Sequence, residues 1–308
     1  MSWTLLLEQM LNGFQLGFLL FLIAAGLTLV FGIMDFINLA HGSLYMVGAY
    51  FAATFTEWTG SYYWGVLLSL PAALLVGVIV EIVALRTLYA RDHLDQVLAT
   101  FGLILFFDEG VRLIWGPIGL DIPLPEALNH SVELIPDIPY HTHRLAIIAV
   151  GIAVAILLWA LVTKTRIGML IRAGASNRRM VSALGVNIKL LYTLVFGLGA
   201  VLAALAGAMD GPLRTAEVGM GNDILILAFV VTVIGGVGSI QGALIAALLV
   251  GLIDTVGRSF LPDLLGFFVS NNFADTAGPA LSSMLIYLLM AVILAIRPQG
   301  LFPPRGAQ

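Results

Sequence analysis

Residues 11–33 read LNGFQLGFLLFLIAAGLTLVFGI, an apolar run without a charged side chain. About 20 such residues cross the hydrocarbon core of a bilayer as a helix. Further apolar runs lie at about 44–55, 64–85, 97–114, 145–162, 190–209, 224–252 and 281–296. A helix satisfies its own backbone hydrogen bonds where water is absent, and no run shows the alternating polarity of a barrel strand. The sequence therefore predicts an all-α, polytopic transmembrane helical bundle, with about eight or nine spans and some of them discontinuous.

The composition agrees with a membrane protein. Of the 308 residues, 60% are hydrophobic and only 10% are charged, whereas soluble domains carry roughly 25% charged residues. The absence of cysteine excludes disulfides and thiolate metal sites, and we expect no metal or other cofactor. A net charge of −4 gives no reason to expect nucleic acid as a partner. No basic segment precedes the first apolar run, so we expect a retained helix rather than a signal peptide, within a single transmembrane domain over 1–308.

The connections between the apolar runs differ sharply in charge. Residues 164–189 hold six of the chain's fourteen Lys and Arg residues, whereas residues 115–143 hold none. Because cytoplasmic loops of membrane proteins are enriched in Lys and Arg, we predict that 164–189 lies in the cytoplasm and that 115–143 is an outer loop. In a bacterial inner membrane, this places the N-terminus on the outer side and residues 297–308 on the cytoplasmic side.

Two polar interruptions break the apolar runs, at residues 35–42 and 235–242. Irregular backbone within a membrane is tolerated where it is buried in protein or lines a cavity, and paired interruptions often mark a transporter's site. Asn38 and His41 are three residues apart and would share a helix face. They are candidates for lining a solute pathway, together with Gly42. The alternative is that they bond to backbone freed by the break, while Gly42 and Gly48 permit close helix contacts.

Residues 169–186 form a basic, amphipathic segment. Leu170, Ala173, Met180 and Leu184 recur at helical spacing, and Gly185 is well placed to end the helix. One interpretation is a helix held at the membrane surface by anionic lipid. The other is a docking helix for a cytoplasmic partner, and the residues alone favour neither.

Several charged residues fall inside or beside the apolar runs, where they are usually functional or paired. We expect structural pairs for Asp108 with Arg112 and for Asp254 with Arg258. Glu81 lies within about a turn of Arg86, so it either pairs with that arginine or snorkels to the membrane surface. A stand-alone, ion-coupled carrier would need a coupling carboxylate, for which Asp254 and Glu109 are the best candidates.

Motifs of enzymes are missing from the sequence. No G-x-x-x-x-G-K-[ST] loop is present to bind nucleotide phosphates, so we expect ATP hydrolysis, if it drives this protein, on other subunits. No combination of nucleophile, base and oxyanion donors is recognisable, which disfavours an intramembrane enzyme.

The chain resembles the permease subunits of ATP-binding-cassette importers for branched-chain amino acids, specifically the shorter of their two permease types. The resemblance rests on four stretches in matching order over essentially the whole chain. They are residues 37–42 (INLAHG) with 48–50 (GAY), 172–186 ending in LGV, 233–242 (VIGGVGSIQG) and 297–302 (RPQGLF).

This resemblance implies a second, related permease, two cytoplasmic ATPases and an external (periplasmic or extracellular) solute-binding protein as partners, besides membrane lipid. It implies a fold like that of the vitamin B12-type permeases. The residues expected to couple to the ATPase are Arg172, Asn177, Arg178, Leu184 and Gly185. Branched-chain amino acids are the first expectation for the solute; other amino acids, urea, short amides and aromatic acids are the alternatives within the family.

Overall fold

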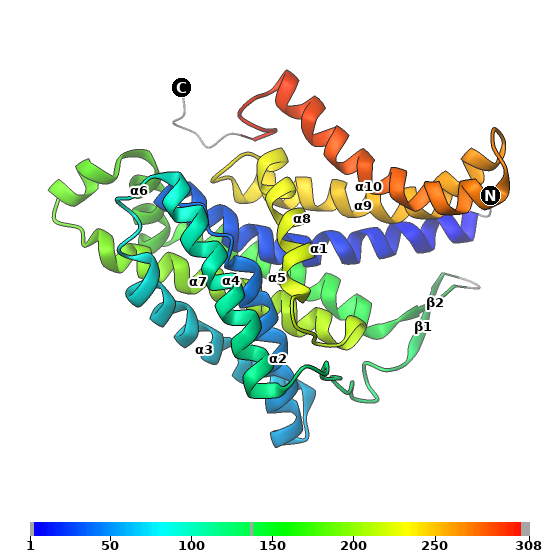
Figure 1. Cartoon of the computed structure of the whole chain (residues 1–308), viewed down its shortest axis with the longest axis horizontal. Helices are drawn as coiled ribbons and strands as arrows, with labels where there is room; N and C mark the ends of the chain where they lie inside the picture. Colours follow the sequence, from blue (N-terminus) through cyan, green and yellow to red (C-terminus); the bar gives the residue numbers. More distant parts are fainter. Residues whose placement is uncertain (1–2, 136–137, 303–308) are drawn as a thin grey trace.

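The computed structural model describes residues 3–135 and 138–302. Residues 136–137 of the predicted outer loop and 303–308 of the predicted cytoplasmic tail lie outside the described residues, as do residues 1–2. The described elements, drawn in Figure 1, are α1 (Trp3–Met34), α2 (His41–Thr59), α3 (Tyr62–Val80), the π-helical turn η1 (Glu81–Leu85), α4 (His93–Trp115), β1 (Ser131–Ile135), β2 (Ile138–His141), α5 (Thr142–Lys164), α6 (Arg166–Ala183), α7 (Ile188–Arg214), α8 (Met220–Gly235), α9 (Ile240–Gly266) and α10 (Asn271–Ile296).

The helices form the polytopic bundle that the sequence predicts. Within the described residues, six helical stretches are long and apolar enough to cross a membrane: α1, α3 with η1, α5, α7, α9 and α10. α8 is apolar but has only 16 residues. The strands β1 and β2 make one short antiparallel hairpin.

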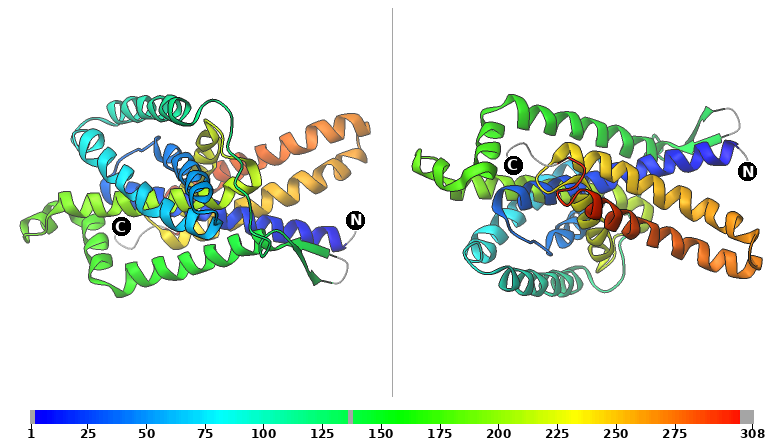
Figure 2. Two further views of the ribbon diagram at one scale, coloured as in Figure 1. Left: turned by 90° about the horizontal axis from the view of Figure 1, so that it is seen from below. Right: turned by 90° about the horizontal axis from the view of Figure 1, so that it is seen from above.

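α1 lies at the centre of the bundle. Of the residues in its most apolar stretch, 83% are buried, compared with 11% in α10. α1 packs against α9, α7, α8 and α5, while α2 packs against α3 and α7. In Figure 2, α5 runs beside α1 on one side and α9 runs beside it on the other, with α10 beyond. The apolar side chains of α10 therefore face outward, as expected for contact with lipid or another membrane subunit.

Glycines allow two close contacts between helices. A β-carbon on Gly251 of α9 would collide with the backbone of Gly13 and Gly17 in α1, and one on Gly42 of α2 would collide with Gly221 of α8. Small residues at such crossings let helices approach closely in membranes. The prediction that Gly42 permits a close helix contact is confirmed.

The two polar interruptions meet at one end of the bundle. Residues 35–40 connect α1 to α2, and residues 236–239 connect α8 to α9; a β-carbon on Gly32 would collide with Gly238. The chain's last described residues bond there too, because the amides of Leu301 and Phe302 donate to the carbonyls of Ile234 and Gly235, at 2.9 and 3.0 Å. This end, which also carries α6, is called the α6 end below.

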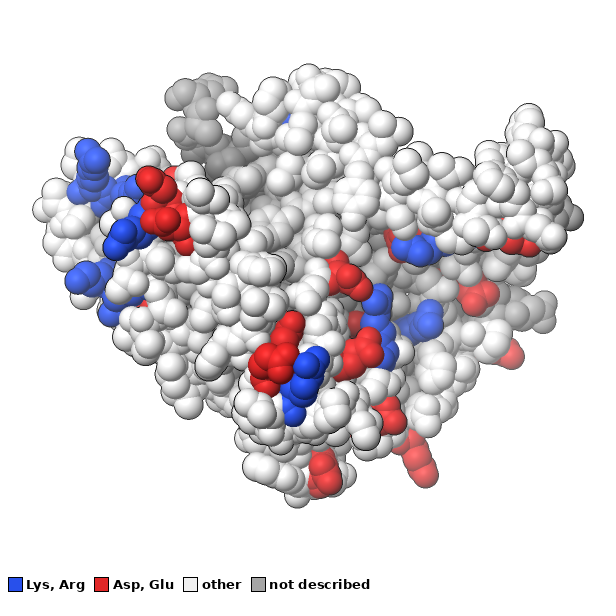
Figure 3. All heavy atoms as spheres, in the orientation of Figure 1, with Lys and Arg blue, Asp and Glu red and all other residues white. Residues whose placement is uncertain are grey.

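The opposite end carries the β1–β2 hairpin and is called the hairpin end. Leu120 and Ala216 form an antiparallel bridge there, so the long loop after α4 is tied to the α7–α8 connection. Lys and Arg side chains cluster over the α6 end, while red acidic side chains predominate toward the hairpin end (Figure 3).

Candidate functional site

Asn38 and His41 lie in the interior where α2 begins, and both side chains are fully buried. The Asn38 Oδ1 accepts a hydrogen bond from the Ala40 amide at 3.1 Å. The His41 Nε2 lies 3.2 Å from the carbonyl oxygen of Ile23, about three turns before the end of α1. Neither residue, nor Gly42, borders the two cavities described below. The Asn38 contact matches the backbone-bonding alternative, whereas His41 contacts a carbonyl inside the unbroken α1. A place for these three residues on a solute pathway stays a prediction.

α6 is two helices joined at a kink. Asn177 has φ −153° and ψ 89°, outside the helical region, and its Oδ1 accepts from the Met180 amide at 3.0 Å. Asn177 thus acts as the N-cap of the second helix. Gly185, at φ +87°, ends that helix in the left-handed conformation that glycine adopts without steric cost. The predicted helix end at Gly185 is confirmed.

The predicted apolar face of α6 is interrupted at Asn177. Met180 and Leu184 are 58% and 77% exposed. The residues that α6 buries are Gly168, Ile171, Gly174 and Val181. The kink at Asn177 changes the helical phase, so residues before and after it no longer share a face.

A cavity of about 540 Å³ lies beside this kink. Its walls are residues 31–33 at the end of α1, Asp35 just after that helix, the α6 residues from Gly174 to Arg179, and Val237 of the α8–α9 connection. Arg178, Arg179 and the carboxylate-bearing Asp35 are exposed. The α6 end therefore presents a hollow with a basic rim and two exposed apolar side chains.

A buried carboxylate fastens η1 to α7 near the start of that helix. Glu81 is fully buried and pairs with Arg86 at 2.9 Å, which is the first of the two alternatives that the sequence left open. It also accepts hydrogen bonds from the Tyr89 hydroxyl at 3.0 Å and the Thr193 hydroxyl at 2.8 Å. Burial, and then the neighbouring Glu81 charge, raise the pKa of Tyr89, so its hydroxyl stays a donor.

A second cavity, of about 710 Å³, is lined by six charged side chains and is called the charged cavity. It is formed by residues of α1, α5, α7, α8, α9 and α10. Two ion pairs belong to it: Asp254 with Arg258 at 2.8 Å, as predicted, and Asp210 with Arg214 at 3.3 Å. The Tyr45 hydroxyl also donates to the Asp210 carboxylate.

One predicted ion pair is wrong. Arg112 pairs with Glu109, one turn away at 2.9 Å, and not with Asp108. Asp108 instead interacts with the side chain of Asn222 in α8. The carboxylates that a stand-alone, ion-coupled carrier would use, Asp254 and Glu109, are thus both held by arginines.

The charged cavity was not predicted from the sequence, although it left a signal there. Gln9, Asn12 and Gln15 line it from α1, and their spacing of three residues places them along one side of an otherwise apolar helix. Asp210 and Arg214 have the i, i+4 spacing of an ion pair. Among the described residues, no group of three or more His, Asp or Glu side chains is placed to hold a metal ion.

Long apolar helices around a central buried helix, together with a charged cavity, define a polytopic membrane protein of the transporter class. The family profile described as "Branched-chain amino acid transport system / permease component" matches residues 9–294. This chain belongs to that family of permease components.

Individual relatives agree with this assignment. The high-affinity branched-chain amino acid transport system permease protein BraD of Pseudomonas aeruginosa is 30% identical, over 96% of this chain and 95% of its own. The corresponding permease protein LivH of Escherichia coli K12 is 31% identical, over 96% and 94%. A fructose import permease protein, FruF of Bifidobacterium longum, is 28% identical over 77% of this chain and 67% of its own. No solved structure matches this chain.

Proposed function

We propose that this chain is a membrane-spanning subunit of an ATP-driven importer of branched-chain amino acids. The observation that supports this most directly is the likeness to BraD and LivH, which covers at least 94% of every chain compared. No nucleotide-binding loop is present in the sequence, so ATP is hydrolysed by separate ATPases. A second permease completes the membrane part of the assembly.

The α6 end is the surface that meets the ATPases in this proposal. Its exposed Met180 and Leu184 stand next to Arg172, Arg178 and Arg179, a combination of apolar anchors and a charged rim that suits a protein interface. Asn177 and Gly185 fix the position of the second α6 helix. Movement of the ATPases would be passed from this helix to α7, and through Glu81 to η1.

The orientation in the membrane follows from the same charges. The positive-inside rule places the α6 end in the cytoplasm and the hairpin end outside, in a bacterial inner membrane. The outer surface around the β1–β2 hairpin and the Leu120–Ala216 bridge then receives the solute-binding protein. The chain acts as one transmembrane domain, with lipid covering the exposed apolar faces of α3, α5 and α10.

Branched-chain amino acids are the proposed solute because BraD and LivH are named for them. The fructose permease FruF shows that likeness over most of the chain does not by itself fix the solute. Other amino acids, urea, short amides and aromatic acids are therefore the solutes to test next. Any contact of Asn38, His41 and Gly42 with the solute would be made at the junction between α1 and α2, where these residues lie.

Co-purification tests this proposal. The tagged chain is extracted gently from its native host, and the proteins that accompany it are identified. Two ATPases and a second permease are the expected companions, and ATP hydrolysis by this assembly should rise when a solute-loaded binding protein is added. A chain that elutes alone and transports a solute down an ion gradient would overturn the proposal.

A further inference from the structure

The charged cavity has a balanced set of charges. Three arginines line it, Arg144, Arg214 and Arg258, and so do three aspartates, Asp210, Asp223 and Asp254. Their formal charges cancel. Charged side chains within membrane helices are costly, and they usually mark a water-filled cavity or a substrate path.

The two ion pairs of the cavity are oriented in the same way. The side chains of Asp210 and Asp254 are 4% and 12% exposed, whereas those of their partners Arg214 and Arg258 are 59% and 50% exposed. The two carboxylates are thus buried in the cavity wall, and the two guanidinium groups face the open space of the cavity. Each arginine uses its Nε for its own aspartate. A guanidinium has five N–H donors, so further donors remain for a ligand.

A separate carboxylate is available on another wall. Asp223 lies in the first turn of α8 and is exposed. Among the described residues, it takes part in none of the four ion pairs. Apolar side chains accompany it, since Ile226 and Leu227 of α8 and Ile286 of α10 also line the cavity.

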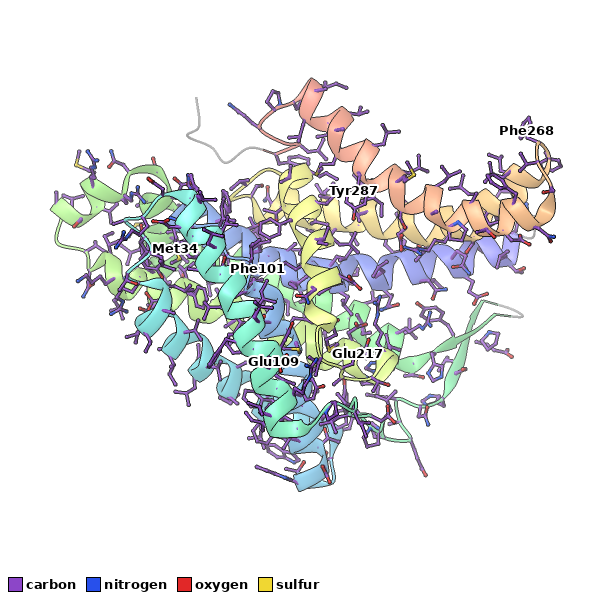
Figure 4. All side chains as sticks on the ribbon, viewed as in Figure 1. Met34, Phe101, Glu109, Glu217, Phe268 and Tyr287 are labelled. Atoms are coloured by element: carbon purple, nitrogen blue, oxygen red, sulfur yellow. The ribbon has the colours of Figure 1, made fainter. Side chains whose placement is uncertain are left out.

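The cavity opens between two parts of the molecule. In Figure 3, blue and red side chains surround the hollow between the α9–α10 arm and the end of α7. In Figure 4, Tyr287, a lining residue, lies on the α10 side of this hollow, and Glu217 lies on the α7–α8 side. The lining residues of α1 and α7 belong to the halves of those helices nearer the hairpin end.

We propose that the charged cavity binds the zwitterion of an apolar α-amino acid. Arg214 and Arg258 receive its α-carboxylate, Asp223 receives its α-ammonium group, and the apolar residues of α8 and α10 contact its side chain. This inference rests on the proposed function and adds to it the site and the groups that recognise the solute.

Thiol labelling tests this inference in native membranes, without ATP. The chain has no cysteine, so a single one can be introduced and labelled with a charged, membrane-impermeant methanethiosulfonate. Ser283→Cys places it in the cavity, where Ser283 accepts a hydrogen bond from Arg258 at 2.9 Å. Met284→Cys is the matched control, because Met284 is the next residue of α10, is 63% exposed and lies outside the cavity lining.

The cysteine at position 283 should react at least about tenfold faster than the one at 284, because the reagent needs a hydrated thiolate. Leucine should slow its labelling. 4-Methylpentanoate, which lacks the amino group, and isoamylamine, which lacks the carboxylate, should not do so at the same concentration. Adding Asp223→Asn should raise the leucine concentration needed for protection about tenfold (about 1.4 kcal/mol), whereas Glu57→Gln, an exposed control outside the cavity, should leave it unchanged.

The possible failures are distinguishable. Slow labelling at position 283, or equal protection by leucine and both analogues, would overturn the zwitterion site even if the chain co-purifies with ATPases. Selective protection by leucine in a chain that has no ATPase partners would support the site and overturn the ATP-driven importer.

Discussion

Replacing Thr193 with valine removes one of the hydrogen bonds that hold the buried Glu81 carboxylate to α7. The bond is 2.8 Å long, its acceptor is fully buried, and Thr193 itself is half-buried. Hydrogen bonds to charged groups contribute about 1.5–3 kcal/mol. Because solvent partly reaches Thr193, we expect Thr193→Val to lower the free energy of unfolding by about 1–2 kcal/mol.

Thermal unfolding of the purified chain in detergent measures this change. At about 2–4 °C per kcal/mol for a chain of this size class, the unfolding midpoint should fall by roughly 2–8 °C. Thr163→Val is the matched control: its hydroxyl is exposed and donates to the Trp159 carbonyl within α5, so its removal should shift the midpoint by less than about 1 °C.

A double variant adds a test of the network. Tyr89→Phe removes the second hydroxyl that donates to Glu81, at 3.0 Å. Because both hydroxyls stabilise the same carboxylate, their losses should not be independent, and the combined effect should differ from the sum by about 0.5 kcal/mol or more. Equal midpoints for Thr193→Val and Thr163→Val would refute the reasoning, since the carboxylate would then not hold η1 to α7.

Three further predictions concern packing, the α6 kink and orientation. Gly251→Ala should destabilise the chain by about 1–3 kcal/mol in thermal unfolding, because its β-carbon meets the α1 backbone. Gly102→Ala in α4, where a β-carbon meets nothing within 4 Å, should leave stability unchanged or raise it by up to about 1 kcal/mol, because alanine is the better helix former. Equal destabilisation by the two changes would contradict this packing. Asn177→Ala should speed hydrogen exchange in the second α6 helix, at a cost of about 1 kcal/mol, and unchanged exchange there would rule out the cap. In intact cells, an impermeant thiol reagent should label Thr59→Cys at the hairpin end but not Leu184→Cys; the reverse pattern would invert the proposed orientation.

The helical bundle was predictable because it follows from the length and composition of the apolar runs in the sequence. The boundaries of α2 were not, since Asn38 and His41 are polar yet fully buried: the expected start near residue 44 moved back to His41, whose ring lies against α1. Local spacing made Arg86 a candidate partner of Glu81, but the bond of Glu81 to Thr193, 112 residues away in the sequence, depends on how α3 and α7 pack.

The candidate sites show the same limit. The helical spacing that we used for α6 does not hold across Asn177, which is non-helical. Residues at helical spacing share a face only along an unbroken helix. Spacing could not choose between Asp108 and Glu109 as the partner of Arg112, since both lie within a turn. The charged cavity required several helices to converge, which no local pattern encodes.

Uptake of labelled leucine into liposomes tests the central claim most directly. This chain is reconstituted with its co-purified permease and ATPases, ATP is supplied on the ATPase side, and the solute-binding protein is added on the other. The account predicts uptake that requires ATP, the ATPases and the binding protein together, and no uptake by the chain alone. Leucine uptake by the purified chain alone, driven by an ion gradient, would contradict it.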